Sequence, residues 1–294
     1  MRIGIVMSRE RPNWPVRRLI RVLEANSCEV VTFCLKNLSV HMDSGKMEFL
    51  LPKRRALDVK GIILRSIGGG STDQITSRIS ILEALEFSGI RVFNSAYSHR
   101  RAKDKLATLV WLAHHGIPIP RTTVTERLAV AVAATKRYND IVSKPLRGSQ
   151  GQGIFRLQDS DLAFRIFKIL QTENQTMLIQ EFITTPGRDI RVFVVGDRVV
   201  GAMYRYAKPG DWKTNVSRGG KPKKCPLSKD LEALALKATT AMKMDFAGID
   251  ILESKDGLVV SEVNSAPNWS GLQKATGVDA AEAIVTHVLQ GLKA

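Results

Sequence analysis

The chain has 294 residues, which is enough for two or three compact lobes and a large buried core. Hydrophobic residues make up 44% and charged residues 24%, a composition that excludes an intrinsically disordered protein. No apolar stretch approaches the roughly 18 residues of a membrane span, no signal peptide is apparent, and the three cysteines have neither disulfide nor metal-ligand spacing. We therefore expect a cytoplasmic protein that does not bind membranes.

The formal net charge of +16 is the unusual value in this composition. A positive field of this kind attracts phosphates, polycarboxylates, nucleic acid or an acidic protein. The charge does not choose among these partners, and a solvated basic surface without a binding role would give the same value.

Strand and helix patterns alternate through the first third of the chain. This β-α-β order implies a small parallel sheet flanked by helices. The predicted strands are residues 1–6, 29–33, 61–64 and 90–93, and the predicted helices lie around residues 16–23 and 75–89.

A glycine-rich turn, Gly68-Gly69-Gly70-Ser71, follows one of these strands. It lacks both the Lys-Ser/Thr of a P-loop and the G-x-G-x-x-G spacing. We interpret it as a strand-to-helix connection facing a cleft, with a phosphate-binding loop as the alternative.

In the middle third, a helix is predicted from about His99 to His115, ending at Gly116. A strand at 140–145 then leads into a loop of small residues and resumes at 154–157, which is the pattern of a hairpin whose tip folds over a ligand. Glycines in that loop let backbone amides approach phosphate oxygens, and Lys144 adds a positive charge at its base. A mobile loop without a ligand would have the same composition.

A further strand at 176–183 carries Gln180-Glu181 near its end. This pair could bind an adenine edge, but on the sequence pattern alone two polar residues at a strand end are better read as facing solvent.

Two hairpins follow in the final third. The first joins 189–195 to 198–202 through Gly196-Asp197, and the second joins 246–252 to 258–264.

The second hairpin carries the candidate metal ligands. Antiparallel pairing about residue 256 places Asp250 opposite Glu262, with Asn264 on the same face. Facing carboxylates repel unless a cation neutralises them, and oxygen ligands of this kind suit Mg²⁺. The alternative is an amphipathic hairpin whose polar residues face solvent.

Between the hairpins lies a basic loop, which we predict to be a lid over an anionic substrate. Aromatic residues are only 6% of the chain, so a base-stacking nucleic-acid patch is not favoured. The charged residues of the loop are Arg205, Lys208, Lys213, Arg218, Lys221, Lys223 and Lys224.

Several motifs stand in a particular order: Lys144 before Gly148–Gly153, Gln180-Glu181, Asp189-Ile190-Arg191, Asn215 with Arg218-Gly219-Gly220, Gly248-Ile249-Asp250 and Glu262-Val263-Asn264. Together they resemble the ATP-grasp superfamily, and more narrowly the RimK-type glutamate ligases. The stretches Leu64–Gly68, Ala207–Trp212 and Lys274–Asp279 also resemble this group, so the similarity covers nearly the whole chain.

The resemblance implies an α/β protein with the ATP-grasp fold in three domains. These would be an N-terminal pre-ATP-grasp domain with a parallel sheet (1–95), a central lid domain (96–184) and a C-terminal domain with an antiparallel sheet and the metal site (185–294).

The resemblance also implies roles for individual residues. One or two Mg²⁺ or Mn²⁺ ions would be held by Asp250, Glu262 and Asn264. Arg191 and Arg218 would be catalytic, Arg191 by stabilising charge on the transferring phosphoryl group. ATP would be bound by Lys105, Lys144, Gly148, Ser149, Gln150, Gly151, Gly153, Gln180, Glu181, Phe182, Asp189, Lys213, Thr214 and Asn215. Substrate would be bound by Arg65, Lys221, Lys223 and Asn268.

In such ligases a carboxylate attacks the γ-phosphate of ATP, and the amine of an amino acid, here expected to be L-glutamate, attacks the resulting acyl-phosphate. No general base is identifiable. Acceptors of the resembling enzymes are anionic: tetrahydromethanopterin, a deazaflavin coenzyme or the C-terminal tail of a ribosomal protein. Asn268 and Trp269 lie where relatives vary, which leaves the acceptor open, with a lean towards a small glutamyl cofactor.

Two other functions stay open. A nucleic-acid- or ribosome-binding protein that keeps the fold would explain the charge, but it has no use for the metal residues and the phosphate lysines. A ligase that joins a different amino acid to a carrier protein would share the same site. Related ligases are often dimers or tetramers, so we also expect a homo-oligomer.

Overall fold

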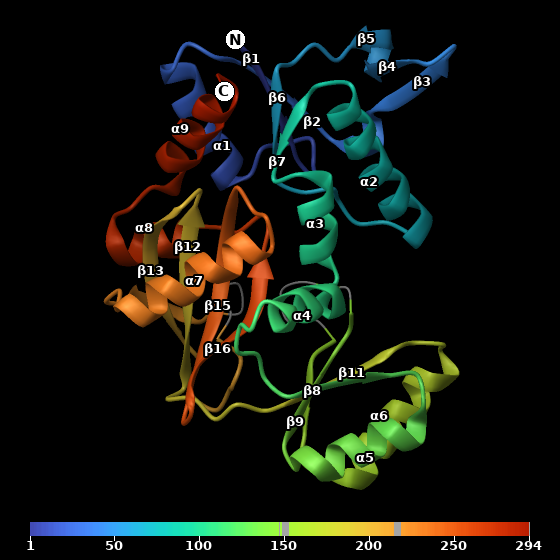
Figure 1. The fold of residues 1–294 in the computed structure, drawn as a ribbon, viewed down its shortest axis with the longest axis vertical. Helices are drawn as coiled ribbons and strands as arrows, with labels where there is room; N and C mark the ends of the chain where they lie inside the picture. The colour runs from blue at the N-terminus through green and yellow to red at the C-terminus, as the bar shows by residue number, and fades with distance from the viewer. Residues whose placement is uncertain (147, 149–152, 215–218, 294) are drawn as a thin grey trace.

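The computed structural model describes residues 1–146, 148, 153–214 and 219–293 (Figure 1). Its described strands form four sheets, three of which carry the architecture that the motifs predicted. No helix among these residues has the length and apolar character needed to cross a bilayer. The domain boundaries at 95 and 184 stay a prediction.

The N-terminal sheet is parallel, with the order β2-β1-β6-β7, as predicted. Helices α1 and α9 cover one face, against Ile3 and Ile5, and α2 covers the other, against Ile62 and Leu64. The elements are β1 (Arg2–Val6), β2 (Glu29–Phe33), β6 (Gly61–Leu64), β7 (Arg91–Phe93), α1 (Trp14–Ala25), α2 (Thr72–Phe87) and α9 (Ala280–Gly291).

A small antiparallel sheet that the sequence patterns did not predict is inserted before β6. It comprises β3 (Ser39–Asp43), β4 (Lys46–Leu51) and β5 (Arg55–Ala56), with short 3₁₀ turns at Leu35–Asn37 and Pro52–Arg54.

The helix predicted from His99 to His115 is two helices, α3 (Ala96–Lys103) and α4 (Lys105–His114). Asp104 breaks the run because its backbone is extended, and its carboxylate accepts a hydrogen bond from the amide of Ala107 (3.1 Å). The residue is therefore an N-cap, which starts a new helix within the mostly charged stretch 99–105.

The central sheet is antiparallel, with the order β10-β9-β11-β8, and the predicted hairpin is its β9-β10 pair. Its two helices pack on the side away from the rest of the molecule (Figure 1). The elements are β8 (Thr122–Thr125), β9 (Ile141–Lys144), β10 (Phe155–Leu157), β11 (Met177–Glu181), α5 (Leu128–Tyr138) and α6 (Ser160–Thr172).

The C-terminal sheet is antiparallel, with the order β14-β13-β12-β15-β16. Side chains of β12 alternate between its faces: Val192 and Val194 pack towards α7, and Phe193 and Val195 towards α8 and α9. The elements are β12 (Arg188–Val195), β13 (Arg198–Tyr206), β14 (Lys221–Lys224), β15 (Phe246–Ser254), β16 (Gly257–Asn264), α7 (Lys229–Ala241) and α8 (Ser270–Thr276).

Buried polar groups tie the N-terminal sheet to the start of β15 and the end of β16. The side-chain amide of Asn94 donates to the carbonyls of Phe246 and Ser265, both at 2.7 Å, and accepts from the amide of Asp245 at 2.6 Å. His99 on α3 contacts the hydroxyl of Ser265 at 3.0 Å. These bonds fix the segment that follows Asn264, where the candidate metal residues end.

Candidate active site

Strand register brings the predicted acidic residues onto one face of the C-terminal sheet. Asp250 lies opposite Glu262 on β16, as predicted, and opposite Arg191 on β12. Asp189 lies opposite Arg205 on β13. Five charged side chains from the four neighbouring strands β13, β12, β15 and β16 therefore lie on one face of the sheet.

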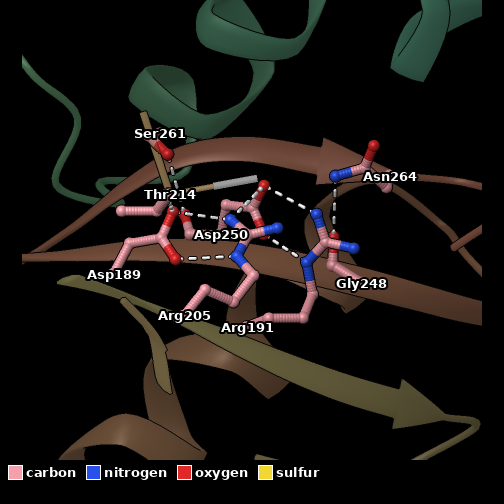
Figure 2. Close-up of polar contacts among 8 residues, drawn as sticks. All are labelled: Asp189, Arg191, Arg205, Thr214, Gly248, Asp250, Ser261 and Asn264. Carbon is pink, nitrogen blue, oxygen red and sulfur yellow. Dashed lines mark hydrogen bonds and ion pairs between the residues drawn. The ribbon is translucent and has the colours of Figure 1, made fainter. Parts of the chain in front are cut away.

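Asp250 is almost completely buried and is held by two arginines (Figure 2). Its carboxylate accepts hydrogen bonds from Nε and Nη2 of Arg191, the latter at 2.7 Å, and Nη2 of Arg205 lies 3.0 Å away. Burial alone would raise the pKa of Asp250, but the two guanidinium groups outweigh it and hold that pKa below its usual value. The carboxylate is thus ionised and compensated by the chain's own cations.

Arg205 also binds Asp189, through hydrogen bonds of 2.7 and 2.6 Å to its two carboxylate oxygens. The hydroxyl of Thr214 donates to Asp189 at 2.5 Å, which brings the segment after β13 onto the same cluster. Burial lowers the pKa of Arg205, but Asp250 and Asp189 raise that pKa by more than burial lowers it. This guanidinium therefore stays charged. The sequence pattern placed Arg205 in the predicted substrate lid, whereas it lies within β13 and pairs with Asp189.

Gly248 leaves the space in which Arg191 lies. A Cβ at this position would be 2.7 Å from Cβ of Pro267 and 3.1 Å from Cδ of Arg191. Asn264, directly opposite, donates from its side-chain amide to the Gly248 carbonyl at 3.4 Å (Figure 2).

Lysines surround the second carboxylate, Glu262. Burial lowers the pKa of Lys144 and of Lys105, while the charge of Glu262 acts in the opposite direction on both. Lys103, at the end of α3, is exposed, but it too lies close enough for Glu262 to raise its pKa against the effect of desolvation. With ammonium groups outnumbering carboxylates here, this region favours an anion such as phosphate.

A small pocket lies where α4 meets the central sheet and β16. Lys144 donates to the side-chain oxygen of Gln180 at 2.7 Å, and Gln180 in turn donates to Thr122 at 3.0 Å. Nζ of Lys105 lies 3.3 Å from the Gly148 carbonyl. The pocket is lined by Ala102, Lys105, Thr108, Leu109, Lys144, Leu178, Gln180, Ser261 and Glu262.

The remaining nucleotide candidates spread along the edge of the central sheet. Gln180 is buried, so the interpretation that it faces solvent is wrong. The carboxylate of Glu181 binds Arg121 through the amide (2.8 Å) and Nε (2.5 Å). The ring of Phe182 lies between Arg156, at 3.6 Å from its centroid, and Trp212, at 5.8 Å.

Lys213 contacts the predicted hairpin, and its Nζ donates to the carbonyl of Ile154 at 3.1 Å. Gly153, beside it, has a positive φ of 67°. Five candidates lie outside the described residues: Ser149, Gln150, Gly151, Asn215 and Arg218.

Among the substrate candidates, Arg65 reaches the segment after Asn264. Its Nη2 donates to the carbonyl of Pro267 at 2.6 Å, and its guanidinium lies 5.0 Å from the ring of Trp269. Burial lowers the pKa of Arg65 to about 10, and its Nε and Nη1 have no hydrogen-bond partner among the described residues. Asn268 is exposed and accepts from the amide of Ser270 at 2.9 Å.

Lys221 and Lys223 do not join this cluster. The loop predicted over residues 205–224 ends in the edge strand β14, because residues 221–224 pair with β13. Pro222 lies opposite Arg205, so Lys221 and Lys223 face the other side of the sheet, opposite Tyr206 and Tyr204. The loop prediction is wrong for these residues, and their role in substrate binding stays a prediction.

The oxygen-rich face fits a hard cation only in part. Asp250, Glu262 and Asn264 offer the oxygen ligands that Mg²⁺ accepts. Among the described residues, however, no group of three or more His, Cys, Asp or Glu side chains is arranged to hold a metal. A magnesium ion here would therefore need ligands from phosphate and water, as is usual for this ion.

Comparison with known proteins shows the family to which the chain belongs. Residues 102–288 match the model of the RimK-like ATP-grasp domain. The tetrahydromethanopterin:alpha-L-glutamate ligase of Methanococcus maripaludis is 35% identical, with 100% of this chain and 99% of the relative covered. A probable alpha-L-glutamate ligase of Haemophilus influenzae (strain PittEE) is also 35% identical, over 84% of this chain and 80% of the relative.

Solved structures share the fold. The RimK domain protein ATP-grasp from Sphaerobacter thermophilus superposes with a TM-score of 0.75 at 23% identity, covering 98% of this chain and 99% of that chain. The ATP-grasp ligase PsnB, in complex with a phosphomimetic variant of its minimal precursor, Mg and ADP, gives a TM-score of 0.74 at 19% identity, covering 99% and 98%. Sequence motifs, sheet topology and relatives agree, and this chain belongs to the RimK-like ATP-grasp family of ligases.

Proposed function

We propose that this ATP-grasp ligase adds L-glutamate to a small anionic acceptor through an acyl-phosphate. The observation that supports this proposal most directly is the pocket where Lys105 and Lys144 lie close to Glu262, beside the Asp250 cluster. It offers cations for phosphate groups next to carboxylates that suit a metal. Relatives named as glutamate ligases that match this chain over most of its length support the choice of amino acid.

In the proposed reaction, an oxygen of the acceptor carboxylate attacks the γ-phosphorus and the bond from that phosphorus to ADP breaks. The glutamate amine then attacks the acyl carbon and inorganic phosphate leaves. Lys105, Lys144 and Arg191 would hold the phosphate oxygens and spread the developing charge. No described side chain is assigned as the base for the amine proton.

When bound, a magnesium ion would supply positive charge that offsets the charge of the phosphates. Asp250, Glu262 and Asn264 would hold it, as one ion or two, and Mn²⁺ offers a substitute of similar ligand preference. Arg191 and Arg205 already form hydrogen bonds or ion pairs with the Asp250 carboxylate. For Asp250 to bind the ion, Arg191 would have to exchange this contact for one with the nucleotide phosphates.

For the acceptor, we propose tetrahydromethanopterin or a similarly anionic cofactor, ahead of a deazaflavin coenzyme or a ribosomal protein tail. The support is the relative from Methanococcus maripaludis, which carries that substrate in its name and matches the whole chain. We also propose that the enzyme is a homo-oligomer, which light scattering would check.

The first experiment measures ADP release from ATP and Mg²⁺ with each amino acid, with and without each candidate acceptor. Release that requires glutamate and one acceptor would support the proposal. Release with a different amino acid or a carrier protein would replace glutamate but keep the chemistry. No release, together with salt-sensitive RNA binding, would overturn it in favour of a nucleic-acid-binding protein.

A further inference from the structure

A groove between α1 and α8 lies outside the ligase site. Figure 1 shows both helices on the same side of the molecule, next to α9. The groove is lined by Trp14, Arg18, Arg21, Ser270, Gln273 and Lys274. Half of these residues are cationic, and none is acidic.

One of the cations is fixed in place by the protein. Arg18 donates from Nε to Asp279 at 2.7 Å and contacts the same oxygen through Nη2. Asp279 accepts from the indole Nε1 of Trp269 at 2.9 Å and caps α9 through the amide of Ala281. The Arg18 guanidinium is therefore ordered before any ligand arrives, which reduces the entropy lost on binding.

The other two cations are not neutralised. Arg21 on α1 and Lys274 on α8 are exposed and line the same groove. Neither forms an ion pair with any residue that the structure describes. With Asp279 counted, Arg18, Arg21 and Lys274 leave a net charge of two positive units, so a bound anion would relieve their repulsion.

Two further groups suit a ligand that has an apolar part and a hydrogen-bond donor in addition to its negative charge. Trp14 forms an aromatic wall, with its ring edge-on to Trp269 at 5.8 Å. The side-chain oxygen of Gln273 is buried and accepts no hydrogen bond from the described residues, so a donor on the ligand would satisfy it.

The groove is connected to the ligase site through one side chain. Trp269 packs on Trp14 at the groove, and the guanidinium carbon of Arg65 lies 5.0 Å from the centroid of the Trp269 ring. Arg65 in turn holds the carbonyl of Pro267, just after the candidate metal residue Asn264. An occupant of the groove would thus contact Trp14, which packs on Trp269, and Trp269 packs on the arginine that holds this segment.

We propose that the α1–α8 groove binds a small multivalent anion, carrying carboxylate or phosphate groups together with a hydrogen-bond donor. Two sources supply this chemistry: the end of the acceptor remote from its reacting carboxylate, or a separate small anion. The site also gives a role to Lys274 and Asp279. They are the two ends of the Lys274–Asp279 motif, which has no role in the proposed nucleotide site.

The test is calorimetric titration of the full chain with tricarballylate and, separately, with inorganic phosphate, with ADP present to fill the nucleotide site. We expect saturable binding of at least one probe, weakened about tenfold or more in Arg21→Ala/Lys274→Ala. The control is Arg165→Ala/Lys168→Ala, which removes the same charges from exposed positions on α6 and should bind like wild type. Circular dichroism melts check that both variants are folded.

Absence of saturable binding in the wild type would overturn the proposal, as would equal weakening in the two double variants. Once an acceptor is known, ligase assays identify the source of the anion. A raised KM for the acceptor in Arg21→Ala/Lys274→Ala, with kcat unchanged, assigns the groove to the acceptor itself. An unchanged KM, with turnover altered by the free probe only in the wild type, assigns it to a separate anion.

Discussion

Asp250 compensates the buried Arg205 and the partly buried Arg191, so its substitution has consequences beyond catalysis. Asp250→Ala should lower the free energy of unfolding by about 3–5 kcal/mol, because Arg191 and Arg205 would lose their common counter-ion. Urea unfolding measures this change, and ADP release should be abolished as well.

Glu262→Gln is the matched contrast. Glu262 is only half-buried and makes no hydrogen bond with a described residue, but its charge offsets the burial of Lys105 and Lys144. Glu262→Gln should therefore lower the free energy of unfolding by about 1 kcal/mol, less than Asp250→Ala does, while ADP release is lost. Equal stability in Asp250→Ala and Glu262→Gln would contradict the buried pairing, and near-normal turnover in either would remove that residue from the metal site.

His99 makes stability depend on pH. Burial lowers its pKa to about 3, against an ordinary value near 6.5, so the imidazole is neutral in the folded protein. The unfolded chain takes up a proton below about pH 6.5 and the folded protein does not, so stability falls as pH drops towards 3, by up to about 1.4 kcal/mol per pH unit. In His99→Gln this component should vanish. Urea unfolding at a series of pH values tests it, and parallel curves for variant and wild type would rule it out.

Glycine at position 248 is required by a close approach between strand and loop. In Gly248→Ala, the new Cβ would displace Pro267 or Arg191. We expect about 1–3 kcal/mol of destabilisation and a reduced kcat for ADP release, because Arg191 would move. Gly69→Ala is the control, since its Cβ would meet no atom within 4 Å. Unaltered turnover in Gly248→Ala would contradict the expectation that this close approach holds Arg191 in a position needed for the reaction.

At the level of strands and helices, the sequence predicted what depends on local pattern. The parallel sheet and both hairpins follow from apolar runs and turn residues, and all are confirmed. Asp104 was missed because its capping depends on one side-chain hydrogen bond, and an aspartate among Arg101, Lys103 and Lys105 resembles one more charge on a helix surface. The β3-β4-β5 sheet was missed although Ser39–Asp43 and Lys46–Phe49 alternate polar and apolar residues around the turn at Ser44-Gly45, so this hairpin could have been predicted.

Two β-bulges explain why part of the site could be predicted and part could not. A regular hairpin closed by Gly196-Asp197 would place Asp189 opposite Tyr204, but the bulge at Phe193/Val194 shifts the register so that Arg205 faces it. Likewise, pairing continued from Ser254–Gly257 would put Ser261 opposite Asp250, and the bulge at Asp250/Ile251 brings in Glu262. Pairing centred on residue 256 happened to include the second shift, whereas nothing in the sequence revealed the first.

For the whole molecule, the net charge of +16 should appear in the kinetics. We expect kcat/KM for an anionic acceptor to fall several-fold as KCl rises from about 50 to about 300 mM, with kcat little changed, because screening weakens the attraction of anions. Steady-state assays at constant Mg²⁺ measure this. A salt-independent kcat/KM would mean that the surface charge has no part in capturing the acceptor.

The buried apolar residues are divided unequally among the lobes, and this sets the order in which the chain opens. Ile3 and Ile5 share one cluster with Phe193 and Phe246, so the two outer sheets should open together. The central sheet has its own smaller cluster, within residues 131–179. Amides of β9 and β11 should therefore exchange with deuterium through a partial unfolding of lower free energy than the global event that exposes β1 and β12. The predicted central lid domain would thus be a separate cooperative unit, and a bound nucleotide should stabilise this domain more than it stabilises the rest of the fold.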